Sequence, residues 1–167
     1  TAFLYGNTAL QLAKQLNYSK GIADSYNNIG NIYFHQSNYD RALENHLASL
    51  KIREELYAQQ GSPKDESRLK ADIAACYNNI GSVYSSLDKY DMAMGYYIKA
   101  LKIYEELKNE SGMATQYGNI GVIYFNQNNF PKALDYFSMA LKMEEKLGNK
   151  IKIARHLGNI GLIYLNQ

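Results

Sequence analysis

The tripeptide Asn-Ile-Gly occurs four times in the chain, and this internal repeat constrains the fold more than any other feature. The four glycines are Gly30, Gly81, Gly121 and Gly161. The first two are 51 residues apart, and the others follow at intervals of 40. Regular recurrence of this kind is typical of arrays in which one supersecondary unit stacks on the next. We therefore expect an array with a period of 40 residues that is interrupted once by 11 additional residues.

The positions around each glycine also repeat, and their spacing predicts a helix. An alanine lies seven residues before the glycine, a large apolar residue four before it, and a tyrosine three after it. These positions hold Ala23, Ala74, Ala114 and Ala154, then Tyr26, Tyr77, Tyr117 and Leu157, and then Tyr33, Tyr84, Tyr124 and Tyr164. Offsets of three, four and seven place side chains on one face of a helix.

A second helix is predicted after a short polar turn in each repeat. The turns are Ser37-Asn38-Tyr39, Asp88-Lys89-Tyr90 and Asn128-Asn129-Phe130, and the helices after them carry Ala42, Ala93 and Ala133. Asp40, Asp91 and Pro131 suit the first turn of a helix. One such hairpin cannot bury its own apolar face, so neighbouring hairpins must stack. A mid-helix glycine costs roughly 1 kcal/mol relative to alanine. We therefore expect the partner helix to approach it closely, with its small alanine filling the opposite hollow.

This pattern resembles the tetratricopeptide repeat over nearly the whole chain. The three matching units are Tyr26-x-x-Ile29-Gly30-x-x-Tyr33 with Ala42-x-x-x-His46, Tyr77-x-x-Ile80-Gly81-x-x-Tyr84 with Ala93-x-x-x-Tyr97, and Tyr117-x-x-Ile120-Gly121-x-x-Tyr124 with Ala133-x-x-x-Phe137. The closing proline is missing and the period exceeds the usual 34 or so. Both departures resemble the long-repeat branch found in kinesin light chains, Pins-type G-protein modulators and bacterial sensor or regulator proteins. The resemblance implies an all-α, right-handed superhelical array of antiparallel helix hairpins.

The repeat frame divides the chain into five segments. Residues 1–19 are the second helix of a partial repeat, 20–60 are repeat 1, 61–109 are repeat 2 with an extended first helix, 110–149 are repeat 3, and 150–167 are the first helix of a partial repeat 4. The 11 additional residues fall near residues 57–70. Gly61 is a good helix terminator and Ser62-Pro63 fits a helix start, so one helix is expected from about Pro63 to Ser86. The insertion is either an additional contact surface or a tolerated extension.

The resemblance implies that the non-packing residues of the first helices line a concave binding surface. By register, the expected peptide-binding residues are Asn28, Asn31, His35, Asn78, Asn79, Ser82, Ser86, Asn119, Val122, Asn126, Arg155, Asn159 and Leu162. An amide side chain both donates and accepts, so a row of asparagines can pair with the backbone of an extended peptide. The alternative is that these asparagines form hydrogen bonds between helices.

The charges on the first helices indicate which peptides the surface disfavours. Members of the family that hold chaperone C-termini use a clamp of Lys and Arg, whereas the corresponding positions here are Asp24, Ala75, Thr115 and Arg155. Phe34, Phe125 and Leu165 add apolar surface nearby. We therefore expect a neutral peptide with apolar anchors.

Catalytic and metal-binding patterns are weak, so no enzyme activity, metal or cofactor is expected. The pairs Glu54-Glu55, Glu105-Glu106 and Glu144-Glu145 are interpreted as a solvated helix face that recurs at one repeat position. His35, His46 and His156 lack the spacing of a helical metal site and are expected at the surface or between helices. Cys76 is expected to be a buried, inert thiol.

Charge and hydropathy exclude two further classes of partner. Eighteen Lys and Arg against sixteen Asp and Glu give a net charge of +2, which disfavours nucleic acid. No run of about 18 apolar residues occurs, so no membrane partner is expected. A cytoplasmic location is expected, although a periplasmic or other extracytoplasmic sensor region also fits.

The function that these observations favour is a protein–protein interaction module within a larger signalling or scaffold protein. The alternative is a structural spacer or dimerisation array whose groove holds no peptide. The two incomplete repeats would allow head-to-tail self-association. We expect Ile160, Ile163 and Tyr164 at one end, and Ala2, Tyr5, Ala9 and Leu12 at the other, to be exposed for this contact.

Overall fold

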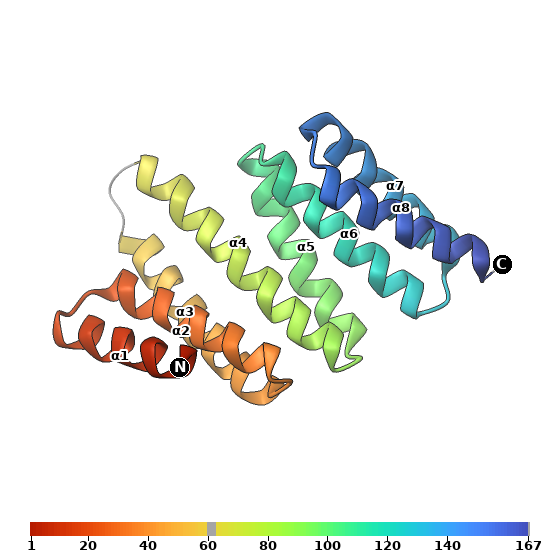
Figure 1. Cartoon of the computed structure of the whole chain (residues 1–167). Helices are drawn as coiled ribbons and strands as arrows, with labels where there is room; N and C mark the ends of the chain where they lie inside the picture. Colours follow the sequence, from red (N-terminus) through yellow and green to blue (C-terminus); the bar gives the residue numbers. More distant parts are fainter. Residues whose placement is uncertain (60–62, 167) are drawn as a thin grey trace. The chain divides into compact units, whose positions relative to one another are not determined.

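The computed structural model describes residues 1–59 and 63–166, and within these ranges the regular secondary structure is entirely helical. The helices are α1 (Ala2–Gln15), α2 (Ser19–His35), α3 (Tyr39–Gln59), α4 (Pro63–Ser86), α5 (Tyr90–Glu106), α6 (Glu110–Asn126), α7 (Phe130–Leu147) and α8 (Lys150–Leu165), as Figure 1 shows. Successive helices run antiparallel, and short turns join those whose connection is described, which confirms the predicted all-α architecture of stacked hairpins.

The short turns share one backbone conformation. Each contains a residue with a φ angle between 50° and 70°, in the left-handed region: Asn17, Ser37, Asp88, Lys108, Asn128 and Gly148. The amide of the next residue then donates to a carbonyl in the last turn of the preceding helix. An example is the 2.9 Å bond from Asn38 to Tyr33. Asparagine side chains cap the helices that follow, because Asn109, Asn129 and Asn149 accept from backbone amides of α6, α7 and α8.

The inserted residues lengthen the two helices that flank them. Helix α3 has 21 residues and α4 has 24, whereas α2 and α5 have 17 each. The predicted long helix from Pro63 to Ser86 is confirmed. Gly61 and Ser62, the expected terminator and N-cap, lie outside the described residues.

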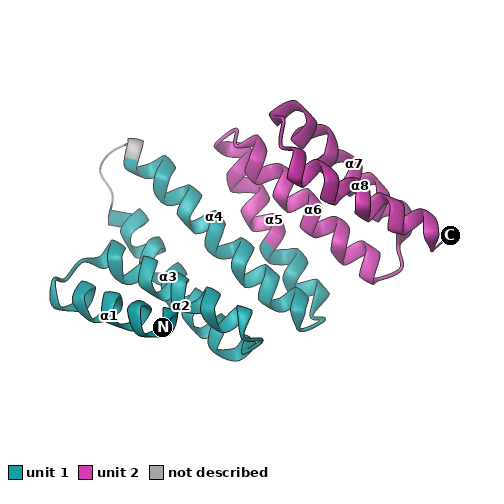
Figure 2. Cartoon of the chain, viewed as in Figure 1, with its two compact units in different colours: residues 1–96 teal, residues 97–167 magenta. Residues whose placement is uncertain are grey.

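The chain forms two compact units, residues 1–96 and residues 97–167, with the boundary inside α5 (Figure 2). In the first unit, the fully buried side chains include Ala23, Ala74 and Ile80. In the second unit, Ala133, Phe137 and Ile163 form a core cluster around which Tyr124, Phe125, Phe130, Leu134 and Ile160 pack. Ala23, Ala74 and Ala114 therefore mark the buried helix face, as predicted, whereas Ala154 on α8 is exposed.

One expectation about exposed ends is wrong. Ile163 belongs to the core of the second unit and is fully buried, so it is not available to an added helix. Ile160 packs against the same core. Tyr164 is exposed, as expected, and so are Ile151, Leu157, Leu162 and Leu165 on the same helix.

Candidate functional site

Two of the repeated glycines lie directly beneath an aromatic ring of the following helix. A Cβ atom added to Gly30 would lie 2.8 Å from the ring of His46, and one added to Gly121 would lie 2.7 Å from Phe137 Cδ1. These distances are too short for carbon atoms in contact, so neither position has room for a side chain. The expectation that the small alanine of the second helix fills this hollow is wrong. The ring four residues after that alanine fills it.

In the first unit, predicted binding residues form hydrogen bonds between helices. Asn79 Nδ2 on α4 donates to Asn27 Oδ1 on α2 at 2.9 Å. Asn78 Nδ2 donates to Asn79 Oδ1 at 3.3 Å. The bond from Asn79 to Asn27 ties one first helix to the next, which is the role that the sequence left open beside the peptide clamp, whereas the bond from Asn78 to Asn79 lies within α4.

The other predicted residues of the first unit remain on its surface or close to it. Asn28, His35 and Ser86 are exposed, and Asn31 and Ser82 are half-buried. The Ser82 hydroxyl donates to the backbone carbonyl of Asn78 on its own helix, at 3.0 Å. Asp24, at a position compared with the carboxylate clamp, forms an ion pair with Arg53 at 2.6 Å.

The second unit brings three predicted binding residues together around an apolar cavity. Val122, Asn159 and Leu162 line a space of about 120 Å³, which Phe125 and Phe137 complete. Val122 is 38% exposed and Leu162 is 48% exposed, so the cavity is accessible from solvent. The remaining predicted residues of this unit, Asn119, Asn126 and Arg155, do not line it. Sequence analysis did not assign Phe137 to a site, because its place in the repeat pattern is that of a packing residue.

A buried polar cluster lies where α2, α3 and α4 meet. Arg53 Nη1 donates to the backbone carbonyl of Asp72 at 3.1 Å and lies 3.4 Å from Cys76 Sγ. Cys76 is fully buried, as predicted, and Ser49 Oγ lies 3.6 Å from its sulfur. Burial raises the pKa of the Cys76 thiol, although the nearby Arg53 guanidinium opposes this rise. The thiol is therefore a packed neutral group, not a nucleophile.

The glutamate pairs do not form one solvated face, so this prediction is wrong for Glu144. The side chain of Glu144 is fully buried, and Lys152 Nζ lies 2.9 Å from its Oε1. Lys152 Nζ also donates to Thr115 Oγ1 at 3.2 Å. The error is one of register, because Glu144 matches Arg53 and Tyr104 in the repeat frame. The exposed members of the three pairs are Glu54, Glu55, Glu105, Glu106 and Glu145.

Two of the three histidines are buried between helices, and His35 is exposed. His46 packs against Gly30, and a Cβ atom on Gly118 would lie 2.7 Å from His156 Cε1. Burial lowers the pKa of His46 to about 4 and lowers that of His156 as well. Both rings are therefore neutral at physiological pH. Among residues 1–59 and 63–166, no group of three His, Cys, Asp or Glu side chains is arranged to hold a metal ion.

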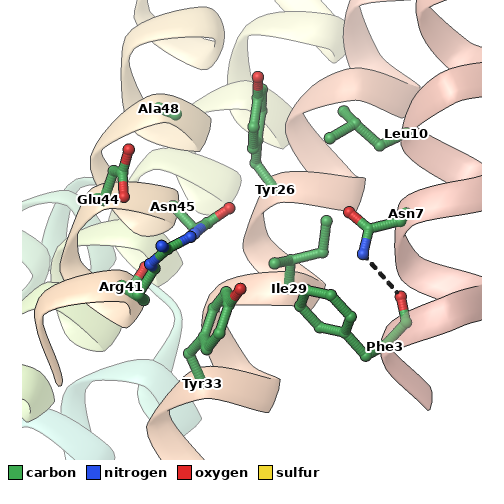
Figure 3. A pocket seen from close by; sticks show the side chains of 10 residues that line it. All are labelled: Phe3, Asn7, Leu10, Tyr26, Ile29, Tyr33, Arg41, Glu44, Asn45 and Ala48. Atoms are coloured by element: carbon green, nitrogen blue, oxygen red, sulfur yellow. Dashed lines mark hydrogen bonds between the residues drawn. The ribbon is translucent and has the colours of Figure 1, made fainter. Parts of the chain in front are cut away.

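A larger cavity that the sequence analysis missed lies among α1, α2 and α3. Its volume is about 350 Å³, and Figure 3 shows the side chains around it. Tyr26, Ile29 and Tyr33 come from α2. Phe3, Asn7 and Leu10 come from α1, and Arg41, Glu44, Asn45 and Ala48 come from α3. The sequence contains a signal for this cavity, because the repeat position that holds Tyr96 and Tyr136 in the later repeats holds the smaller Asn45 in the first.

No helix in the described part of the chain is both long enough and apolar enough to cross a lipid bilayer.

Comparison with known proteins identifies the family. Tetratricopeptide repeat models match residues 22–62, 73–107 and 114–147. The uncharacterized protein ycf37 of Cyanophora paradoxa is 28% identical over 91 residues, which cover 54% of this chain and 45% of that protein. Two solved structures share the fold. The apo form of RapI matches with a TM-score of 0.81 at 16% identity, over 99% of this chain and 43% of RapI.

The second is the Rap conjugation gene regulator of the plasmid pLS20 in complex with the Phr* peptide. It matches with a TM-score of 0.74 at 17% identity, over 92% of this chain and 40% of the regulator. The chain thus spans less than half the length of each of these proteins. Since the repeat models match most of its residues, the chain belongs to the tetratricopeptide repeat family and is a protein–protein interaction module.

Proposed function

We propose that the chain binds an extended, largely neutral peptide segment of a protein partner on the exposed surface of its first helices. The observation that carries this proposal is the accessible cavity lined by Val122, Asn159 and Leu162. An apolar cavity with one amide at its edge suits an apolar side chain whose neighbouring peptide group pairs with that amide. A related fold in complex with a peptide supports the same class of partner.

Within the second unit, each residue has a distinct role in this proposal. Val122 and Leu162 contact the apolar anchor of the peptide, and Asn159 holds its backbone. Asn119, Asn126 and Arg155 extend the contact along α6 and α8. In the first unit, Asn28, Asn31, His35 and Ser86 offer a further polar surface to the same kind of ligand. There Asn79 pairs with Asn27 of α2 and holds the two helices in register, while the hydrogen bonds of Asn78 and Ser82 to their neighbours lie within α4.

The wider role that we propose is that of a non-catalytic part of a larger signalling or scaffold protein in the cytoplasm. The chain would bring a partner to other domains through peptide binding, without a metal or cofactor of its own. We also assign the five repeat segments, from 1–19 to 150–167, as the units of this array.

The second candidate function is a structural spacer or dimerisation array whose surface holds no peptide. The hydrogen bonds among Asn27, Asn78 and Asn79 favour it, because they give the asparagines a purely structural role. Both candidates use the same fold, so a binding measurement must separate them.

The test compares two leucines of α8 that have similar exposure but different surroundings. Leu157 is 52% exposed and Leu162 is 48% exposed, and of the two Leu162 alone lines the cavity. Peptides would be selected from a displayed random library on the 167-residue chain, and their affinities measured by fluorescence anisotropy. We expect enrichment of peptides with an apolar residue. Leu162→Ser should weaken binding about 5- to 30-fold, which corresponds to a loss of about 1–2 kcal/mol of apolar contact.

Leu157→Ser is the matched control and should bind like the wild type. Equal losses in the two variants would place the peptide elsewhere on α8. No enrichment above background, together with self-association of the chain, would favour the structural candidate.

A further inference from the structure

Two tyrosines fill the same place in successive repeats. The ring of Tyr96 is stacked on Tyr84 with centroids 5.6 Å apart, and it is tilted against Tyr77 at 6.0 Å. Both contacts lie in the first unit. In the second unit, the ring of Tyr136 is stacked on Tyr124 at 5.4 Å and tilted against Tyr117 at 6.1 Å. Each ring therefore occupies the space between the tyrosines four before and three after the repeated glycine.

The first hairpin has no such ring, and a cavity takes its place. Asn45 stands three residues after Ala42, as Tyr96 and Tyr136 stand three residues after Ala93 and Ala133. The tyrosines that would flank the missing ring, Tyr26 and Tyr33, both line the 350 Å³ cavity. In the second unit, a cavity of about 340 Å³ is lined by Tyr117 but by neither Tyr124 nor Tyr136. The space between the two tyrosines is thus open in the first hairpin and filled in the third.

The walls of the first cavity combine aromatic surface with hydrogen-bond acceptors. The Phe3 ring meets Tyr33 edge-on at 5.3 Å, and the Arg41 guanidinium lies over Tyr33 at 5.9 Å. Asn45 Nδ2 donates to the Arg41 carbonyl at 2.8 Å, and Asn7 Nδ2 donates to the Phe3 carbonyl at 3.0 Å. Both amide oxygens then point into the space between the helices (Figure 3). Each oxygen is an acceptor that a hydroxyl group can reach.

We propose that this cavity binds the side chain of a tyrosine presented by a protein partner. The ring lies between Tyr26 and Tyr33, as Tyr96 and Tyr136 lie between the tyrosines of their own hairpins. The phenolic hydroxyl donates to Asn45 Oδ1 or Asn7 Oδ1, which makes tyrosine a better occupant than phenylalanine. Arg41 and Glu44 at the rim carry opposite charges, so the site does not select a charged side chain.

This tyrosine site is separate from the proposed peptide surface. Tyr26, Ile29 and Tyr33 lie on one face of α2, whereas Asn28 and Asn31 lie on the opposite face. The two proposals can therefore succeed or fail independently.

The test uses p-cresol, which reproduces the tyrosine side chain, and toluene, which reproduces that of phenylalanine. Each would be titrated into isotope-labelled chain and followed by NMR. We expect saturable shifts of the Asn7 and Asn45 side-chain amides and of the Tyr26 and Tyr33 rings. Toluene should bind at least about tenfold more weakly, because it lacks the donor hydroxyl.

Two variants test the proposal by exchanging the residues that stand at the same position in different repeats. Asn45→Tyr should fill the cavity with the chain's own ring and abolish binding of p-cresol. Tyr136→Asn should open the equivalent space beside Tyr117 and Tyr124, so that p-cresol then binds at a second place in the chain. Far-ultraviolet circular dichroism would confirm that both variants stay folded.

The outcomes that would overturn the proposal are equally specific. Unsaturated shifts spread over the chain, or equal affinity for toluene and p-cresol, would show a nonspecific apolar surface. Unchanged p-cresol binding in a folded Asn45→Tyr variant would place the probe elsewhere. Side-chain signals of Asn7 and Asn45 that move on dilution without probe would show that a second copy of the chain occupies the cavity.

Discussion

At the scale of single residues, the repeated glycines differ in whether the structure leaves room for a side chain at the same repeat position. A Cβ atom on Gly121 would lie 2.7 Å from Phe137, whereas around Gly161 no atom beyond its chain neighbours and its own helix backbone lies within 4 Å of the Cβ position. Both glycines are four positions or more inside a helix of the second unit. The difference between them is therefore the ring of the following helix, not the helix itself.

We predict opposite effects of alanine at these two glycines. Gly121→Ala should lower the free energy of unfolding by about 1–3 kcal/mol, because Phe137 must move to make room. Gly161→Ala should raise it by up to about 1 kcal/mol, because alanine is the better helix former. Urea denaturation followed by circular dichroism measures both. A Gly121→Ala variant as stable as the wild type would show that the ring moves aside freely.

The buried ring of His46 makes stability depend on pH. Burial lowers its folded-state pKa from 6.5 to about 4, so the folded chain binds fewer protons than the unfolded chain between these values. The free energy of unfolding should therefore fall as pH falls from 6.5 to about 4, by at most about 1.4 kcal/mol per pH unit. Below about pH 4 this contribution should level off.

We predict that His46→Phe removes part of this pH dependence. Phe137 occupies the equivalent place against Gly121, so a phenyl ring should fit against Gly30. His156 has a lowered pKa as well and should leave a residual slope of the same sign. Urea titrations across this pH range measure the effect, and His35→Gln, at an exposed position, is the control. An unaltered slope in His46→Phe would contradict the assignment.

Residue-level prediction succeeded where a side chain's role follows from its place in the period. The alanines Ala23, Ala74 and Ala114 and the thiol Cys76 are all fully buried, as expected. It failed for Glu144, because charged residues are usually solvated and the pairing with Lys152 depends on the next helix. The contact between Glu144 and Lys152 can be predicted only when the repeat positions of α7 and α8 are considered together.

At the scale of helices, one repeat position joins each second helix to the first helix that follows it. The pairs at this junction are Ala13 with Gly21, Arg53 with Asp72, Tyr104 with Gly112, and Glu144 with Lys152. In the first pair, two small residues meet. In the second, the Arg53 guanidinium donates to a backbone carbonyl, in the third a ring packs on a glycine, and the fourth is an ion pair. The two residues at each junction thus fit each other and would fit those of another junction less well. This favours the observed pairing of neighbouring helices over a pairing in which helices change places.

The Glu144–Lys152 junction gives a prediction about α7 and α8. Lys152→Met should destabilise the chain by about 3–5 kcal/mol, because it leaves the buried carboxylate of Glu144 without its counterion. The double variant Glu144→Leu with Lys152→Met should recover most of this loss, since it removes the buried charge altogether. Thermal and urea unfolding of the two single variants and the double variant give the coupling energy. Additive effects would contradict a buried, paired carboxylate.

Helices were more predictable than sites, for a physical reason. Helix bounds depend on local signals, and the turns at Ser37, Asp88 and Asn128 carry them in their sequence. The cavity beside Asn45 depends on three helices and on a side chain that is smaller than its repeat equivalents. The row of asparagines was correctly placed on the first helices, but the sequence could not decide between a ligand and the neighbouring helix as partner.

At the scale of the whole molecule, stability in a repeat array is close to a sum of terms between neighbouring hairpins. A helix with no neighbour on one side therefore keeps apolar surface exposed. On α1, Tyr5 is 70% exposed and Leu12 is 53% exposed, and on α8 Tyr164 is 63% exposed. In the repeat frame Tyr5 matches Tyr136, and Tyr164 matches Tyr124.

This correspondence predicts weak head-to-tail association of the 167-residue chain. Tyr5 of one copy would stack on Tyr164 of the next, as Tyr136 stacks on Tyr124 at 5.4 Å. Gly6, however, stands where Phe137 stands in the frame, so the hollow above Gly161 would stay empty. The tyrosine contact favours association and the unfilled hollow limits it, so we expect dimers and short rows only at high concentration.

Sedimentation velocity over a range of concentrations measures this association. Tyr164→Asn should reduce it, because the stacking partner of Tyr5 is lost. Met139→Ser is the control, since Met139 is 49% exposed on α7 and lies outside the proposed contact. If both variants associate like the wild type, α1 and α8 do not meet in this way. If the wild type stays monomeric at every concentration, the empty hollow outweighs the stacked rings.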